Sequence, residues 1–222
     1  MWNTSARIFV SLGLLGAASL LPLQAQNYSK FAFNMGGGIT TPLNPTGAYA
    51  GVSGNFAVGA GYNINKSNAI IGEFMYSGLP SNSFVLQPVK LPTSNIHLYS
   101  LTVNYRHQFD RISGSPFGVY FSAGGGWYQR YATLDKNYTV PAAVPCAPYW
   151  YWYGYTCADG YVYSETVAKK GVSAGGLNSG IGFTIRLADS NLRFFTEARY
   201  HYAFSEHVPT TVVPVTFGIR YN

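Results

Sequence analysis

The chain has little charge and no long apolar run beyond its first residues. Only 10% of its 222 residues are Asp, Glu, Lys or Arg, against roughly 25% in soluble domains. That is a poor supply of solubilising side chains. Beyond residue 25 the uninterrupted apolar stretches are only a few residues long, too short for a transmembrane helix.

Basic clusters are also lacking. The formal net charge of +6 is spread along the chain, and Lys169-Lys170 is the only adjacent basic pair. With no basic arm and no alternation of aromatic and basic residues, we expect no nucleic-acid partner. Moderate basicity suits contact with phosphorylated lipid head groups, and simple solvated charge explains it about as well.

Aromatic residues and glycine are abundant instead. Phe, Trp and Tyr make up 17% of the chain, and 25 Gly and 12 Pro work against long helices. Apolar and polar residues alternate with a period of two, which predicts β-strands. The eight predicted strands are 30–41, 51–63, 68–78, 96–109, 117–131, 171–187, 192–206 and 211–222.

The predicted connections alternate in length, as in outer-membrane β-barrels, where short turns lie in the periplasm and longer loops outside. The short ones are 63–67, 110–116 and 188–191; the others are 42–50, 79–95, 132–170 and 207–210. The sequence therefore predicts an all-β, eight-stranded antiparallel up-and-down transmembrane barrel with both chain ends in the periplasm.

The first 25 residues have the pattern of a secretory signal peptide. Arg7 precedes a charge-free apolar run from Ile8 to Leu21, and Ala25 offers a small residue for cleavage. We expect residues 1–25 to be removed and residues 26–222 to form the barrel. No Cys follows the apolar run, which argues against a lipoprotein anchor.

Periodicity alone does not say which face of the sheet points inward. A soluble periplasmic β-sandwich or lipocalin-like binding barrel would bury the apolar face. The low total charge and a polar face rich in Gly, which suits a narrow interior filled by side chains, favour an apolar exterior. Solubility of the mature chain without detergent would discriminate the two.

Several segments together resemble the small eight-stranded barrels related to the membrane domain of outer-membrane protein A. These segments are Ile71–Tyr76, Gly118–Trp127, Gly180–Phe183, Thr196–Tyr200 and Pro214–Tyr221. The resemblance implies a monomer in the bacterial outer membrane with a structural or surface-interaction role. It also implies outer-membrane lipid and the barrel-assembly machinery as partners.

In the family resembled, paired interior acids and bases plug the lumen. The corresponding candidates here are Glu73, Arg106, Glu197 and Arg199, all on predicted polar faces. Because a buried charge is costly unless paired, we expect mutual neutralisation. A selective constriction for ions is the functional alternative.

An enzyme is the second class to consider, because outer-membrane lipid A deacylases use Ser, His and an acidic residue on an eight-stranded barrel. His201, Ser205, Glu206 and His207 lie along or beside the seventh predicted strand. Ala203 stands where the nearest same-face Ser would be needed. We therefore expect no enzyme activity, no catalytic residue and no cofactor; release of acyl chains from purified lipid A would show otherwise.

The longest predicted connection carries both cysteines and a cluster of aromatic residues. Cys146 and Cys157 have no His or acidic residue between them, so no metal site is predicted. Exposed aromatic clusters tend to mark contact sites, so the segment is a candidate for binding an extracellular ligand or surface; a structural role above the membrane is the alternative. The aromatic residues are Tyr149, Trp150, Tyr151, Trp152, Tyr153 and Tyr155.

We predict a Cys146–Cys157 disulfide, because an exported chain enters an oxidising compartment. Closing a loop of this size removes on the order of 2 to 3 kcal/mol of unfolded-state entropy in the usual model. Mass spectrometry of protein taken directly from outer membranes should find the linked peptides. Two free thiols would rule the bond out.

Overall fold

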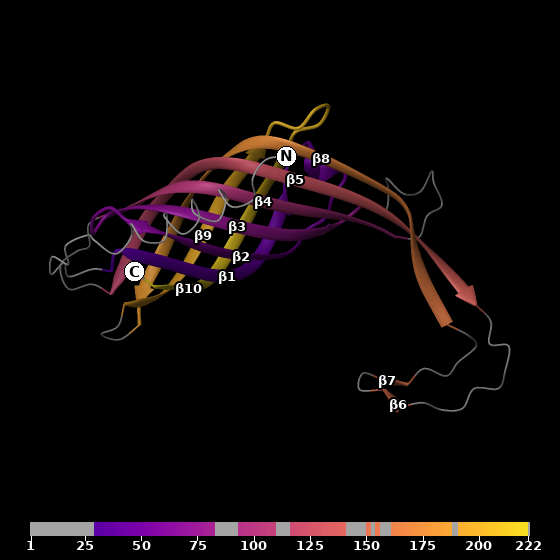
Figure 1. The fold of residues 1–222 in the computed structure, drawn as a ribbon, viewed down its shortest axis with the longest axis horizontal. Helices are drawn as coiled ribbons and strands as arrows, with labels where there is room; N and C mark the ends of the chain where they lie inside the picture. The colour runs from indigo at the N-terminus through magenta and orange to yellow at the C-terminus, as the bar shows by residue number, and fades with distance from the viewer. Residues whose placement is uncertain are drawn as a thin grey trace, which may run out of the picture.

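The computed structural model describes residues 29–82, 93–109, 116–140, 150–151, 154–155, 161–187 and 191–221. Eight strands close into an antiparallel barrel in the order β1-β10-β9-β8-β5-β4-β3-β2 (Figure 1). The predicted eight-stranded barrel is confirmed. The strands are β1 (Phe31–Pro42), β2 (Ser53–Asn63), β3 (Asn68–Pro80), β4 (Thr93–Gln108), β5 (Phe117–Val140), β8 (Tyr161–Arg186), β9 (Leu192–Ala203) and β10 (Thr210–Tyr221).

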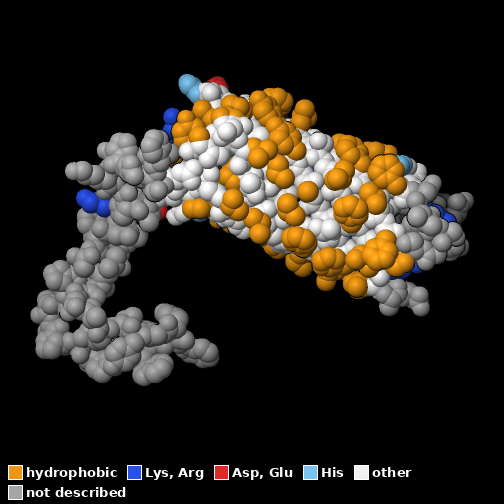
Figure 2. Space-filling model, turned by 180° about the vertical axis from the view of Figure 1, so that it is seen from behind, with side chains coloured by type: hydrophobic (Ala, Val, Ile, Leu, Met, Phe, Trp, Pro, Cys, Tyr) orange, Lys and Arg blue, Asp and Glu red, His pale blue; other side chains and the backbone are white. Residues whose placement is uncertain are grey.

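The apolar face of the sheet points outward, as predicted. On β4, Leu101 and Val103 are 57% and 62% exposed, whereas Thr102 and Asn104 between and beside them are buried. Figure 2 shows the consequence on one side of the barrel, where hydrophobic side chains spread over the wall and charged ones lie towards its two ends. An apolar surface of this extent needs lipid around it. In the described ranges no helix is long and apolar enough to cross a membrane.

Closure of the sheet depends on the seam between the first and last strands. β1 pairs with β10 from Phe33↔Tyr221 to Pro42↔Val212 without a shift in register. Gly38 and Gly218 lie on this seam, and a Cβ on either would overlap backbone of the other strand. The two glycines therefore permit a close approach where the barrel closes, which leaves the sheet no open edge in the hydrocarbon.

The outer mouth of the barrel is filled by an apolar layer. Leu79 of β3 and Leu98 of β4 are each 1% exposed, and Val212 of β10, a strand on the other side of the ring, is fully buried in the same cluster. Ala50 and Ile96 complete the cluster. These side chains point into the barrel at the end where the longer connections lie. They therefore narrow the lumen at its outer end.

The connection from β1 to β2 folds over this layer. It contains the short 3-10 helix η2 (Thr46–Ala48). Thr46 is buried; its hydroxyl donates to the carbonyl of Pro209 at 3.1 Å and accepts from the backbone N–H of Thr211 at 2.8 Å. The side chain of Asn82 donates to the carbonyl of Gly47 at 3.0 Å. The first outer connection is thus tied to the segments before β4 and β10.

Two strands are much longer than the rest. β5 has 24 residues and β8 has 26, against 16 in β4 and 12 in β1. Among the described residues, 161–174 of β8 pair with β5 and with no other strand. We call the part of this hairpin formed by residues 136–140 and 161–174 the outer ribbon. In Figure 1 it runs well past the end of the barrel wall.

The outer ribbon corrects one prediction. Residues 132–170 were expected to be a loop, yet β5 continues to Val140 and β8 begins at Tyr161. A cross-strand ladder therefore continues above the wall, with one β-bulge between Leu134 and Asp135. Beyond it, β6 (Trp150–Tyr151) pairs with β7 (Gly154–Tyr155).

We predict that a charge on the lipid-facing wall destabilises the barrel. Val103→Arg, near the middle of β4, should lower the free energy of unfolding by about 2 to 4 kcal/mol. Val167→Arg is the matched control, because Val167 is similarly exposed, at 52%, but lies on the outer ribbon. Urea unfolding in lipid vesicles measures both; equal losses in the two variants would contradict a lipid-facing wall.

Candidate functional site

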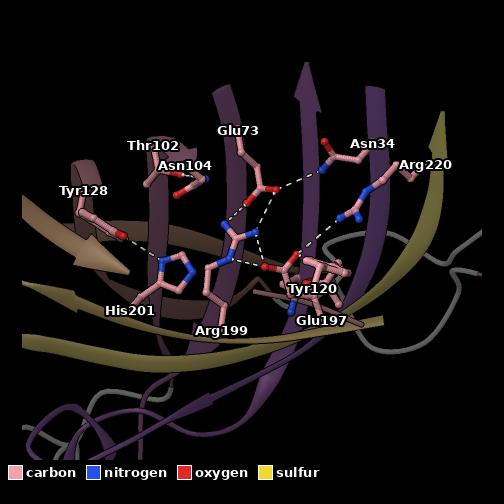
Figure 3. Close-up of polar contacts among 12 residues, drawn as sticks. Asn34, Glu73, Thr102, Asn104, Tyr120, Tyr128, Glu197, Arg199, His201 and Arg220 are labelled. Carbon is pink, nitrogen blue, oxygen red and sulfur yellow. Dashed lines mark hydrogen bonds and ion pairs between the residues drawn. The ribbon is translucent and has the colours of Figure 1, made fainter. Parts of the chain in front are cut away.

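Arg199 is the centre of a buried ion-pair cluster in the lumen. Its Nη1 lies 2.6 Å from Oε1 of Glu73, and its Nη2 lies 2.7 Å from Oε1 of Glu197. All three side chains are buried (Figure 3). One guanidinium therefore pairs with both carboxylates in a site from which water is largely excluded, and such pairing is the condition under which buried charges are tolerated.

The Arg199–Glu73 pair crosses the whole lumen. Arg199 belongs to β9 and Glu73 to β3, and these strands stand opposite each other in the eight-strand ring. Glu197 precedes Arg199 by two residues on β9, so both side chains point inward from one strand. A single ion pair can join opposite walls because an eight-stranded barrel encloses little more than the width of its own side chains.

Each carboxylate also accepts a hydrogen bond from a neutral side chain. Nδ2 of Asn34 donates to Oε2 of Glu73 at 3.1 Å, and the hydroxyl of Tyr120 donates to Oε2 of Glu197 at 2.9 Å. Tyr120 lies across the β5–β8 ladder from Gly182, where a Cβ would collide with the tyrosine ring. The inward glycine is what gives Tyr120 room to reach Glu197.

Arg106, the fourth predicted member of the cluster, lies on the periplasmic side of these ion pairs. It is buried, and its Nη2 donates to Oδ1 of Asn63 at 3.5 Å. Arg220, outside the predicted set, approaches the cluster instead, with Nη2 3.9 Å from Oε2 of Glu197. Its inward position was visible from the alternation along β10; its contact with Glu197 required the barrel's register.

Two small cavities flank the ion pairs. One is lined by Met75, Phe195, Arg199 and His201, among others. The other lies among the three arginines and the two glutamates, with Asn34 and Asn104 in its wall. Each has a volume of about 10 Å³ for the centre of a water-sized sphere, room for roughly one water molecule.

The residues of the enzyme alternative do not form a relay. His201 is 1% exposed and shares a hydrogen bond of 2.9 Å with the hydroxyl of Tyr128 inside the lumen. Ser205 instead shares one of 3.2 Å with the hydroxyl of Thr210, and His207 is exposed at the outer rim. The described residues contain no group of three or more His, Cys, Asp or Glu that could hold a metal ion.

The candidates in the outer connection lie mostly beyond what the structure describes. Cys146, Cys157, Tyr149, Trp152 and Tyr153 are outside the described residues. The backbone of Trp150, Tyr151 and Tyr155 belongs to the β6–β7 pair. The disulfide and the contact role of this segment stay predictions.

Comparison with known proteins finds no matching family model and no matching curated protein. Solved structures do match. Neisserial surface protein A is 15% identical with a TM-score of 0.55 and covers 87% of this chain and 97% of its own. The attachment invasion locus protein Ail of Yersinia pestis is 14% identical, with a TM-score of 0.47 and coverages of 87% and 99%. OprG of Pseudomonas aeruginosa is 12% identical, with a TM-score of 0.45 and coverages of 89% and 98%.

At these identities the likeness concerns the fold alone. It agrees with what the barrel shows by itself: eight antiparallel strands, a closed sheet, an apolar wall and a polar lumen. These are the features of a small outer-membrane β-barrel. The protein is therefore a barrel of the bacterial outer membrane.

We predict that Arg199→Met lowers the free energy of unfolding by about 3 to 5 kcal/mol, because two carboxylates stay buried without their main cation. The double variant Glu73→Gln, Arg199→Met removes one charge of each sign, leaves Glu197 beside Arg220 and should recover part of that loss. Urea unfolding in lipid vesicles measures both variants. A double variant no more stable than the single one would mean that Arg199 acts through packing rather than charge.

Proposed function

We propose that this protein is a non-enzymatic outer-membrane barrel that presents the outer ribbon and the aromatic segment beyond it to extracellular ligands or surfaces. The observation that carries the proposal is the length of β5 and β8, which continue well beyond the strands that the bilayer requires. A transmembrane β-strand needs about 9 to 11 residues, and these two strands have 24 and 26.

The filled lumen favours a function at the outer surface over transport of solutes through the barrel. The Arg199–Glu73 pair joins opposite walls at 2.6 Å. Towards the outer end, the layer of Leu79, Leu98 and Val212 fills the lumen a second time. Two successive filled layers leave little path for a solute. We therefore do not propose that this protein acts as a large passive pore.

The outer ribbon has the physical properties of a contact element. Residues 165–171 of β8 are exposed, and their strand edge has no neighbour among the described residues. An unpaired edge offers backbone N–H and C=O groups to an extended partner segment. Lys169, placed 4.6 Å from the centre of the Tyr131 ring, keeps a positive charge at the base of this edge.

Kinship with the membrane domain of outer-membrane protein A is part of the proposal. The inward acids and bases that the resemblance implied support it, since Glu73, Glu197 and Arg199 do meet in the lumen. A lipid-modifying hydrolase is the weaker candidate, because His201 is buried on Tyr128 and away from the surface where lipid would arrive.

We predict that Trp150→Ser with Trp152→Ser abolishes retention of protein-displaying cells on a bare polystyrene surface. Trp side chains supply a large contact area at small conformational-entropy cost. The control is Tyr49→Ser, which removes an aromatic residue 47% exposed in the first outer connection. The double variant should still migrate differently before and after boiling, as a folded barrel does. If the double variant were retained as well as the unmodified protein, the aromatic segment would have a structural role only.

A further inference from the structure

The outward face of the wall changes in chemical character towards its outer end on the side formed by β3, β4, β5 and β8. The cross-strand ladders align outward residues of these strands in rows. From the bilayer outward, the rows are Phe74, Leu101 and Trp127; Tyr76, Tyr99, Gln129 and Ser173; Gly78, His97, Tyr131 and Gly171; and Asn95, Thr133 and Lys169. The surface thus passes from apolar, through aromatic, to polar and basic, which is the order of chemistry along a lipid at a membrane interface.

The aromatic rings of these rows form one connected surface. We call this surface the tyrosine band and define it by Tyr76, His97, Tyr99, Gln129, Tyr131 and Lys169. The ring centres of Tyr76 and Tyr99 are 5.1 Å apart, and those of Tyr99 and Tyr131 are 6.2 Å apart. Nδ1 of His97 shares a hydrogen bond of 2.8 Å with the hydroxyl of Tyr76. The band is therefore continuous from β3 to β5.

Lys169 supplies the positive charge of the tyrosine band. Its Nζ lies 4.6 Å from the centre of the Tyr131 ring. That ring packs over Gly171, where a Cβ would meet it at 2.7 Å. Among the described residues no carboxylate forms an ion pair with Lys169; Asp135, beyond the β-bulge, accepts a hydrogen bond from Thr166 at 2.8 Å. The contact with the ring holds the ammonium group in place, and its N–H donors can still serve an anionic ligand.

The opposite side of the ring lacks such a surface. β1 and β10 stand across the barrel from β5 and β4. The outward residues at their outer ends are Ile39, Thr41, Val213 and Val215, none of them aromatic or charged. An aromatic girdle that only anchors a barrel in the interface would run around it. The one-sided placement favours a binding site for a particular lipid.

The position and width of the tyrosine band indicate the class of its ligand. Leu101 and Trp127, one row nearer the middle of the wall, are 57% and 47% exposed, so the band continues a surface that acyl chains already cover. Four strands at a spacing of about 4.8 Å span about 14 Å, which is wider than a phosphate diester and close to the size of two linked sugar rings. Tyr side chains combine an apolar face with a polar tip, which suits the C–H faces and hydroxyl groups of sugars.

We propose that the tyrosine band binds the head group of a phosphorylated glycolipid in the outer leaflet. The phosphate accepts hydrogen bonds from Lys169, the sugar rings lie across the tyrosines, and the acyl chains follow Leu101 and Trp127 along the wall. The site belongs to the barrel wall and does not depend on a contact role for the aromatic segment beyond the outer ribbon.

The first test is binding by the folded barrel in detergent, measured by native mass spectrometry. The probes are an acylated glucosamine disaccharide with phosphate groups, the same lipid without phosphate, phosphatidylglycerol, and the phosphorylated disaccharide without acyl chains. We expect the phosphorylated glycolipid to bind about fivefold or more tightly than each of the others, because one lysine beside a charged head group contributes about this factor. Equal affinity for phosphatidylglycerol or for the unphosphorylated lipid would overturn the proposal, and so would equal affinity for the free disaccharide, which would assign the surface to a soluble sugar phosphate.

Two adjacent lysines separate a defined site from general attraction between a basic protein and anionic lipid. Lys169→Gln should weaken binding of the phosphorylated glycolipid by about fivefold. Lys170→Gln is the matched control, because it removes the same charge from the next exposed residue, whose side chain points to the other face of the sheet. This control should bind as the unmodified protein does. Equal losses in the two variants would contradict a defined site.

A tyrosine variant tests the ring surface separately from the charge. Tyr131→Leu should weaken binding of the glycolipid both with and without its phosphate. Tyr62→Leu, which removes a tyrosine 42% exposed at the periplasmic end of β2, should change neither. Migration that differs before and after boiling shows that each variant is folded. Unchanged glycolipid binding in folded Tyr131→Leu would rule out the tyrosine band as the site.

Discussion

The constraint on which the rest of the structure depends is that hydrocarbon offers no hydrogen bonds to the backbone. A sheet in a bilayer has to close on itself, since every open edge would expose unpaired N–H and C=O groups. Here closure is made between β1 and β10, whose ladder keeps one register from Phe33↔Tyr221 to Pro42↔Val212. Once the ring is closed, the alternation of side chains assigns one face to lipid and the other to the lumen, as the exposures of β4 illustrate.

A closed ring of eight strands then creates a second problem, namely how to fill a narrow interior. The chain solves it in layers. Paired charges occupy the middle, where Arg199 joins β9 to β3, and an apolar layer at the outer end packs beneath the connection that carries η2. Inward glycines make the charged layer possible, because Gly182 and Gly176 stand where the rings of Tyr120 and Tyr128 need space. Stability and closure of the lumen thus come from the same side chains.

Most of the wall could be predicted from the sequence, because its two faces differ chemically at every second residue. Strand ends were less well defined: β9 was expected to reach residue 206 but ends at Ala203, where the chain leaves the ring. A structural role above the membrane was one alternative for the long connection, but the strand bounds of the outer ribbon were not predicted, because above the membrane neither face has to be apolar and residues 161–170 show no alternation of the kind that marks the wall. Arg220 was placed on the inward face but not beside Glu197, since that contact depends on the register of strands that are distant in sequence. Arg199 meets Glu73 across the lumen because of the order of the strands around the ring. Alternation within single strands carries no information about that order.

Side chains fill the lumen of this barrel, and for that reason we propose the outer ribbon, rather than a pore, as the functional element. Planar-bilayer recording of the purified, folded protein tests this proposal most directly, because an ion pair that spans the lumen and an apolar layer above it leave little path for a solute. We expect no large, stable conductance at any applied voltage that the bilayer withstands. A steady, large pore in the unmodified protein would contradict it.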